Sequence, residues 1–178
     1  DGTTTKKPIG ASRATIFIDR TRTKIRELAY NLEVDGFATP DLTLIAEHIT
    51  TGNVQELAYT RSPDSLIWAL LDTGQLRCLT YERAQDVVAW HRHTIGGTNS
   101  KVKSIAAIPS FDELEEQLYM IVERTINGAT KKYIEFLEKS FDQAKGDTPE
   151  TAFFVDSGLS YSGSAVTSLS GLTHLEGE

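Results

Sequence analysis

Several features that often reveal a function are scarce or missing in this sequence. One cysteine, Cys78, occurs in 178 residues, so an intramolecular disulfide and a zinc cluster built from cysteines are both excluded. No run of about 18 apolar residues is present, so no membrane span is expected, and the first residues contain no signal-peptide core. A phosphate-binding glycine loop, a nucleophile elbow and a calcium loop are missing too. Motifs of the common enzyme classes therefore do not assign this chain.

Charge is negative overall and unevenly distributed. The net charge of -7 argues against a general nucleic-acid binder, whose affinity comes from neutralising phosphates. Up to Tyr30 there are seven Lys or Arg against three acids, whereas from Asp112 onward there are thirteen acids against five bases. The basic start is interpreted as a solvated strand face. An acidic balance still permits a surface that DNA passes without being bound.

What the sequence does contain is a segment that nearly recurs 51 residues later. The matching pairs are Ile16-Phe17 with Ile67-Trp68, Lys24-Ile25-Arg26 with Gln75-Leu76-Arg77, Leu28 with Leu79, and Tyr30 with Tyr81. A weaker third copy runs from Leu118 to Ile134. Strand-rich repeats with a period of about 40–50 residues are typical of β-propeller blades. The spacing therefore predicts a mainly β chain of antiparallel, propeller-type blades.

The pattern of apolar residues and turns places the strands. Strands are predicted at 14–19, 24–33, 54–60, 66–71, 75–81, 87–93, 102–108, 118–124 and 131–137. Four short strands between residues 54 and 93 make one blade. Val54 and Leu57 recur as Val102 and Ile105, so a further blade is expected to begin near residue 102. Asn127-Gly128 is the strongest hairpin signal in the chain.

One short helix is expected near residues 40–50. Pro40 suits an early helical position, and Thr39 or Asp41 could cap the helix. The apolar residues that would share its buried face are Leu42, Ile45, Ala46 and Ile49.

The chain is expected to divide into four parts. Residues 1–13 form an arm or linker, and residues 14–142 form the propeller-blade region. Residues 143–156 are a polar linker, and residues 157–178 are the truncated start of a further small β module. We therefore expect an incomplete propeller fragment, whose unpaired edge strands must be covered in some way.

The most tempting catalytic motif is the Asp72-Thr73-Gly74 loop after an apolar strand. Aspartic proteases bring two such loops together, and a homodimeric enzyme would need one per chain. The following residue is Gln75 instead of a small one, and Ile95-Gly96-Gly97 comes too soon after Asp72 for that fold. The loop is therefore interpreted as a hairpin turn.

His91 and His93 lie two apart on a predicted strand and so point to the same face, as metal ligands sometimes do. Two ligands do not make a site, and the nearest acids, Glu82 and Asp86, fall in the adjoining turn. The histidines are interpreted as solvated, with Trp90 turned into the core. No catalytic, cofactor-binding or metal-ligating residue and no cofactor is expected, so the chain is predicted not to be an enzyme.

Seven segments follow one another in an order that is more distinctive than any single one of them. They are Lys24–Tyr30, Val34–Phe37, Pro40–Ile49, Leu76–Tyr81, Val87–His93, Val102–Pro109 and Ile121–Gly128. This order resembles the propeller region of podovirus tail nozzle proteins, also called tail tubular B proteins, which occur as hypothetical proteins in prophages. Residues 156–163 and 170–177 resemble the entrance to a small β-barrel module of the same proteins.

The resemblance implies a virion structural protein without catalysis. Such proteins assemble as a ring, commonly sixfold, below the head–tail adaptor, and the ring conducts DNA out of the capsid. The implied partners are other tail subunits and the adaptor, with DNA passing through and not specifically bound. The implied location is the virion tail, and the bacterial cytoplasm during assembly. The alternative is a propeller-type module for protein–protein interaction in a host protein.

Overall fold

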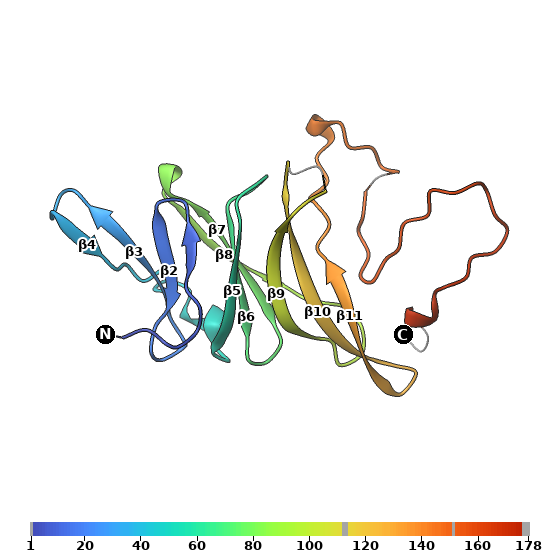
Figure 1. The fold of residues 1–178 in the computed structure, drawn as a ribbon, viewed down its shortest axis with the longest axis horizontal. Coiled ribbons are helices and arrows are strands. Elements are labelled where there is room, and N and C mark those ends of the chain that lie inside the picture. Colours follow the sequence, from blue (N-terminus) through green and yellow to red (C-terminus); the bar gives the residue numbers. More distant parts are fainter. Residues whose placement is uncertain (1, 112–113, 151, 176–178) are drawn as a thin grey trace.

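The chain folds into three antiparallel sheets that are stacked face to face in the order of the sequence (Figure 1). A computed structural model describes residues 2–111, 114–150 and 152–175. Sheet 1 contains β1 (Ile9–Ala11), β2 (Ala14–Ile18), β3 (Ile25–Asn31) and β4 (Gly36–Ala38). Sheet 2 contains β5 (Val54–Thr60), β6 (Leu66–Leu71), β7 (Leu76–Glu82) and β8 (Val87–His93). Sheet 3 contains β9 (Lys101–Pro109), β10 (Glu116–Ile126) and β11 (Ala129–Phe136). The prediction of a mainly β chain is confirmed.

Two apolar layers hold the stack together, one on each face of sheet 2. The layer between sheets 1 and 2 contains Ile16, Ile18, Ile25, Ile67, Leu79 and Tyr81. The layer between sheets 2 and 3 contains Trp68, Leu70, Leu76, Val102, Leu118 and Met120. Strand β6 is buried along nearly its whole length because it contributes to both layers, which explains its unbroken apolar sequence. Strands β2 and β3 cover only one layer and alternate accordingly.

The first strands of the three sheets, β1, β5 and β9, pack against one another in series. Strands β5 and β9 share a β-bulge at matching positions, since Gln55 and Lys103 are each an extra residue in the pairing with the next strand. The Glu56 carboxylate accepts hydrogen bonds from the Ser104 hydroxyl (3.0 Å) and the Ile105 amide (3.1 Å), just after the second bulge. The predicted match of Val54 and Leu57 with Val102 and Ile105 is therefore accompanied by a β-bulge at the same position in both strands.

The repeat at an offset of 51 pairs the right strands of sheets 1 and 2. For β2 and β6, however, the matching residues are offset by 52 instead of 51. Ile25 and Leu76 occupy matching places, each facing the next sheet of the stack. Ile16 also faces the next sheet, but Ile67 faces the previous one, so the residue that matches Ile16 is Trp68. Residues 19–24 connect the first pair of strands, whereas the shorter segment 71–75 connects the second. One residue fewer in a hairpin loop shifts the pairing by one.

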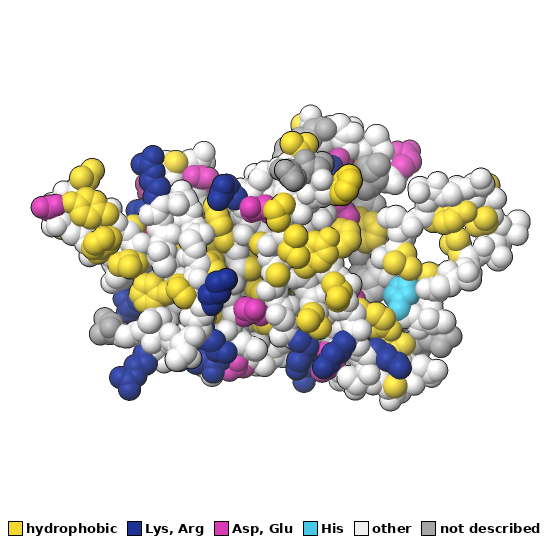
Figure 2. Space-filling view, in the orientation of Figure 1, with side chains coloured by type: hydrophobic (Ala, Val, Ile, Leu, Met, Phe, Trp, Pro, Cys, Tyr) yellow, Lys and Arg dark blue, Asp and Glu magenta, His cyan; other side chains and the backbone are white. Residues whose placement is uncertain are grey.

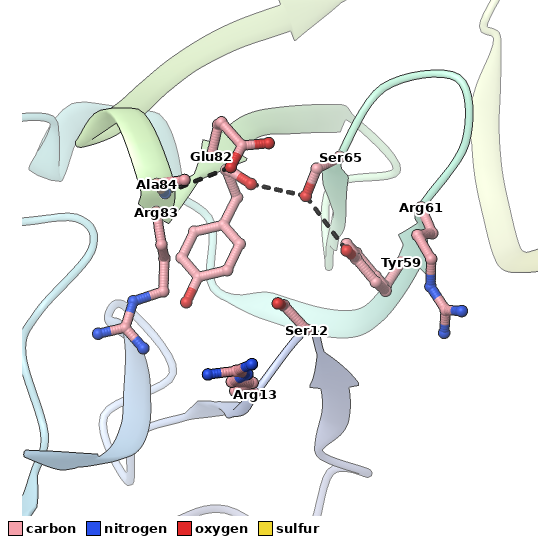
Figure 3. A pocket seen from close by; sticks show the side chains of 9 residues that line it. Ser12, Arg13, Tyr59, Arg61, Ser65, Glu82, Arg83 and Ala84 are labelled. Carbon is pink, nitrogen blue, oxygen red and sulfur yellow. Dashed lines mark hydrogen bonds between the residues drawn. The ribbon is translucent and has the colours of Figure 1, made fainter.

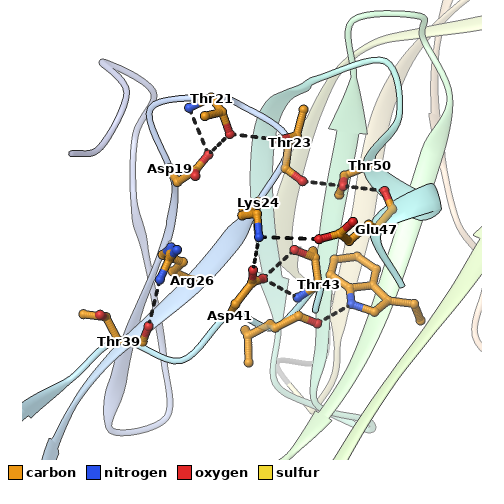
Figure 4. A network of polar contacts seen from close by, with 12 residues as sticks. Asp19, Thr21, Thr23, Lys24, Arg26, Thr39, Asp41, Thr43, Glu47 and Thr50 are labelled. Atoms are coloured by element: carbon orange, nitrogen blue, oxygen red, sulfur yellow. Dashed lines mark hydrogen bonds and ion pairs between the residues drawn. The ribbon is translucent and has the colours of Figure 1, made fainter. Parts of the chain in front are cut away.

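The predicted helix near residues 40–50 is replaced by turns and a short 3-10 helix, η1 (Glu47–Thr50). The Asp41 carboxylate accepts hydrogen bonds from the Thr43 amide (2.9 Å), the Thr43 hydroxyl (2.6 Å) and the Lys24 ammonium (2.9 Å) (Figure 4). The Leu42 amide donates to the Ile25 carbonyl in sheet 1 (2.9 Å). These hydrogen bonds hold residues 41–43 in a turn that is fixed against sheet 1. Ile45, expected on a buried face, is 88% exposed.

The same contacts set the charge state of Asp41. Burial by itself would raise the pKa of this carboxyl, but the hydrogen bonds from Thr43 and Lys24 outweigh it and hold the pKa below its ordinary value. Thr50 donates its hydroxyl to the Thr23 carbonyl and so ties η1 to the β2–β3 connection.

The two ends of the chain differ from their predicted organisation. Residues 1–13 were expected to form an arm, yet β1 lies within them and pairs with β2, and Thr3 bridges to Asp19. From 143 onward the described residues contain two 3-10 turns, η3 (Gln143–Lys145) and η4 (Thr173–Leu175), and no strand. The start of a further small β module at 157–178 stays a prediction, and residues 176–178 lie outside the described residues.

Candidate functional site

Asp72 lies in the turn between β6 and β7 and joins sheet 2 to sheet 1. Its carboxylate pairs with the Arg22 guanidinium (2.6 Å), and the Gly74 amide donates to the Leu71 carbonyl (2.9 Å). Gly74 has φ +84°, which glycine adopts without strain. These are the contacts of a tight turn with a partnered carboxylate, as the hairpin interpretation of Asp72-Thr73-Gly74 expects.

A cluster of three potential metal ligands lies on sheet 2, on the face toward sheet 3. Cys78 on β7 is the cross-strand partner of His91 on β8, and His93 follows on the same face. One ligand atom from each of the three side chains lies within 4.8 Å of the other two. His93 Nε2 and His91 Nδ1 are 3.0 Å apart, at hydrogen-bonding distance. Sequence reasoning identified the two histidines and missed the cysteine between the sheets.

Burial determines the protonation of this Cys78–His91–His93 cluster. The Cys78 side chain is fully buried, and burial raises the pKa of its thiol to about 12. Burial lowers the pKa of His91, and burial together with the neighbouring His91 lowers the pKa of His93. At neutral pH the cluster therefore consists of two uncharged imidazoles above a protonated thiol.

A cavity of about 140 Å³ adjoins the cluster at the outer edge of the gap between sheets 2 and 3. His91, His93 and Trp68 form part of its lining. The acidic side chains that line it are Glu115, Glu116, Glu138 and Asp64. The cluster is thus next to a small space lined by these four acids and Lys139. His91 is exposed, as expected, whereas His93 is half-buried. Trp90 is half-buried on the opposite face, where its indole donates to the Leu42 carbonyl (2.8 Å).

The end of the β7–β8 hairpin determines which residue lies opposite His91. Glu82 and Val87 are paired at the end of the hairpin, across the connecting residues 83–86. Counting back along both strands from that pair places Cys78 opposite His91. Once the pairing of Glu82 with Val87 is known, the sequence alone identifies Cys78 as the third potential ligand.

A second, more open pocket of about 520 Å³ lies between the start of sheet 1 and the β7–β8 connection (Figure 3). Arg13, Arg61 and Arg83 reach it from three separate segments. Arg83 is paired with the buried Glu27 carboxylate (3.0 Å). The Ser65 hydroxyl donates to the Tyr81 carbonyl (2.6 Å). The pocket carries a positive, hydroxyl-bearing surface without a nucleophile–base pair among its lining side chains.

The outer faces of sheets 1 and 3 carry exposed apolar side chains. On sheet 1 these are Leu28, Tyr30 and Phe37, and on sheet 3 they are Ile121, Ile134 and Phe136. Tyr30 and Phe37 are cross-strand partners with ring centroids 5.8 Å apart. Figure 2 shows hydrophobic side chains at the end of the molecule formed by β3 and β4. Both ends of the stack thus present apolar strand surface.

No protein-family model and no curated protein matches this chain. Among the described residues, no helix has the length and apolar character needed to cross a membrane. Any assignment of function therefore depends on the chain's own residues.

Proposed function

We propose that this chain is part of a non-enzymatic structural protein in which sheets 1, 2 and 3 act as blades of a β-propeller. The observation that carries the proposal is the serial packing of three antiparallel meanders through their first strands. In propellers, four-stranded sheets are arranged around a central channel, so innermost strands of successive blades are neighbours. The bulges shared by β5 and β9 fit such a repeated unit.

The apolar outer faces support a larger assembly of the same kind. A further sheet packed on Leu28, Tyr30 and Phe37, or on Ile134 and Phe136, would repeat the apolar layers that cover sheet 2. Contiguous exposed apolar patches of this sort usually mark contact surfaces. We therefore propose sheets of the same type as the partners of these faces.

The specific assembly that we propose is the tail nozzle of a podovirus-type phage or prophage. The order of sequence segments described above supports it, as does the acidic balance, which suits a surface that DNA slides past. In this proposal the full-length protein forms a ring with other tail subunits below the head–tail adaptor, in the virion tail after assembly in the bacterial cytoplasm.

Electron microscopy of the full-length gene product, alone and with the proteins encoded beside it, tests the proposal. Rings or tubes with a central channel are expected. Ile134→Lys should reduce ring formation without unfolding the protein, whereas Lys132→Gln, an exposed change on the same strand, should not. Dispersed monomers under both conditions would contradict the nozzle and favour the alternative of a host interaction module.

A further inference from the structure

We propose that Cys78, His91 and His93 bind a single Zn²⁺ ion and leave its fourth coordination position to solvent. One cysteine and two histidines from adjacent strands are the type and number of protein ligands found in zinc sites that keep an open position. All three ligand atoms are already within 4.8 Å of one another. This inference is independent of the proposed structural role.

The distance between the two imidazole nitrogens is close to what a tetrahedral ion requires, and Cys78 Sγ lies within 4.8 Å of a nitrogen of each ring. Bonds of about 2.3 Å to sulfur and about 2.0–2.1 Å to nitrogen place neighbouring ligand atoms roughly 3–4 Å apart. His93 Nε2 and His91 Nδ1 are 3.0 Å apart, slightly closer than that. A small rotation of the exposed His91 ring opens this distance. The two nitrogens also need free lone pairs, so each ring must carry its proton on the other nitrogen.

The chemistry of the ligands favours zinc over the common hard cations. Thiolate and imidazole suit Zn²⁺, whereas Mg²⁺ and Ca²⁺ prefer oxygen. When the ion bonds to Cys78 Sγ, the thiol S–H bond breaks and its proton passes to bulk water. The imidazoles are neutral and lose no net proton. The cation then compensates the thiolate charge at the place where it forms, which a buried cysteine otherwise disfavours.

The surroundings supply a fourth position and a favourable field. The adjoining cavity of about 140 Å³ has room for water beside His91 and His93. The carboxylates on its wall, among them Glu115 and Glu138, attract a cation to the opening. Lys139 also lines the cavity, but its charge is paired with Asp147 (2.7 Å).

Packing alone explains the cluster less completely. The His93 ring lies 4.9 Å from the Trp68 ring and 4.9 Å from the His91 ring, so the three form an aromatic column. That column accounts for His93 but gives no reason for a cysteine at its base, where any small apolar side chain would pack.

Titration of the untagged, chelator-treated chain with Co²⁺ tests the site. We expect one ion per chain, a sulfur-to-cobalt charge-transfer band, and loss of that band when Zn²⁺ is added. Cys78→Ser should abolish the band. His91→Asn and His93→Asn should each weaken binding at least about tenfold. His48→Asn and His174→Asn remove the same group elsewhere and should leave binding unchanged.

Because Cys78 is buried, its substitution could disturb folding, and His91→Asn at an exposed position provides the independent check. Unchanged circular dichroism with lost binding in His91→Asn would support the site. Absence of the charge-transfer band in the parent chain, or equal weakening by His48→Asn, would overturn it.

Discussion

Sheets 2 and 3 are both antiparallel meanders, yet they differ in how many of their faces are buried. The central strands β6 and β7 of sheet 2 are largely buried on both faces, because each face is covered by another sheet. The β10–β11 hairpin of sheet 3 has one buried face and one exposed face, with alternating burial along β10. Coverage therefore decides which strand pattern a sheet needs, while the strand connections stay the same. A change on the doubly covered sheet should accordingly cost more than a similar change on the outer face.

The largest effect is expected from Leu70→Ala on β6. Leu70 is fully buried between sheets 2 and 3, so its loss leaves a cavity and should lower the free energy of unfolding by about 2–5 kcal/mol. Ile134→Ala on the outer face of sheet 3, where the side chain is 79% exposed, should change it by no more than about 0.5 kcal/mol. Urea unfolding of both variants measures the difference, and equal losses would contradict the comparison.

Two ion pairs on the β10–β11 hairpin sharpen the comparison, one on each face. Arg124 is buried, pairs with Glu135 through both terminal nitrogens, and donates to the Gly96 carbonyl (2.8 Å). Glu135→Gln leaves this buried guanidinium without a counter-charge and should cost about 1–3 kcal/mol.

The matched control is Glu123→Gln, which removes the exposed Glu123–Lys132 pair (3.8 Å) on the other face. It should cost less than about 0.5 kcal/mol, because water screens an exposed pair. Thermal unfolding of the two variants at equal salt decides the matter. A larger loss in Glu123→Gln than in Glu135→Gln would contradict our description of the two faces.

A smaller effect is expected from alkaline pH, through the buried thiol of sheet 2. The pKa of Cys78 is about 12 in the folded chain and 9.0 as a reference, so the folded state keeps a proton that the unfolded state loses. Stability from this group is complete below pH 9 and falls as pH rises toward 12. By pH 10 about 1 kcal/mol should be lost. Burial also raises the pKa of Tyr81, which adds to the loss above pH 10.

Urea unfolding at pH 8 and pH 10 measures this loss, and Cys78→Ser should remove most of it. The experiment must be done with chelator present, since a bound metal ion would change the charge of the thiol. A parent chain whose stability is flat between these pH values would contradict the burial of Cys78.

The sequence was sufficient to predict nearly all the strands, because covered faces leave a clear apolar pattern. Four predicted strands between 54 and 93 are confirmed to within a residue at each end, and the Asn127-Gly128 hairpin is confirmed. The helix prediction was wrong because the spacing of Leu42 and Ile49 suits a helix face as well as it suits an irregular segment with both side chains buried. The hydrogen bonds that hold this segment depend on neighbours distant in sequence, because Asp41 accepts from Lys24 and the Leu42 amide donates to the Ile25 carbonyl.

The ligand cluster was out of reach for a related reason. Sequence spacing shows which histidines share a strand face, and His91 and His93 were identified in that way. It does not show which residue lies across from them until the hairpin end at Glu82 and Val87 is fixed. Cys78 therefore looked like an ordinary core residue. The one-residue register shift between β2 and β6 was hidden for the same reason.

The Glu56 carboxylate, which binds the backbone of β9 beside its bulge, has a consequence for how this stack can grow. The position that matches Glu56 one unit later is Ser104, which has no carboxylate to offer a following sheet. This hydrogen bond therefore links sheet 2 to sheet 3, and sheet 3 has no equivalent carboxylate for a sheet that follows it. A duplicated or transplanted copy of sheet 3 would therefore lack this hydrogen bond to the sheet that follows it. Ser104→Glu would not restore it, because Ser104 donates its own hydroxyl to Glu56 and a second carboxylate there would repel the first.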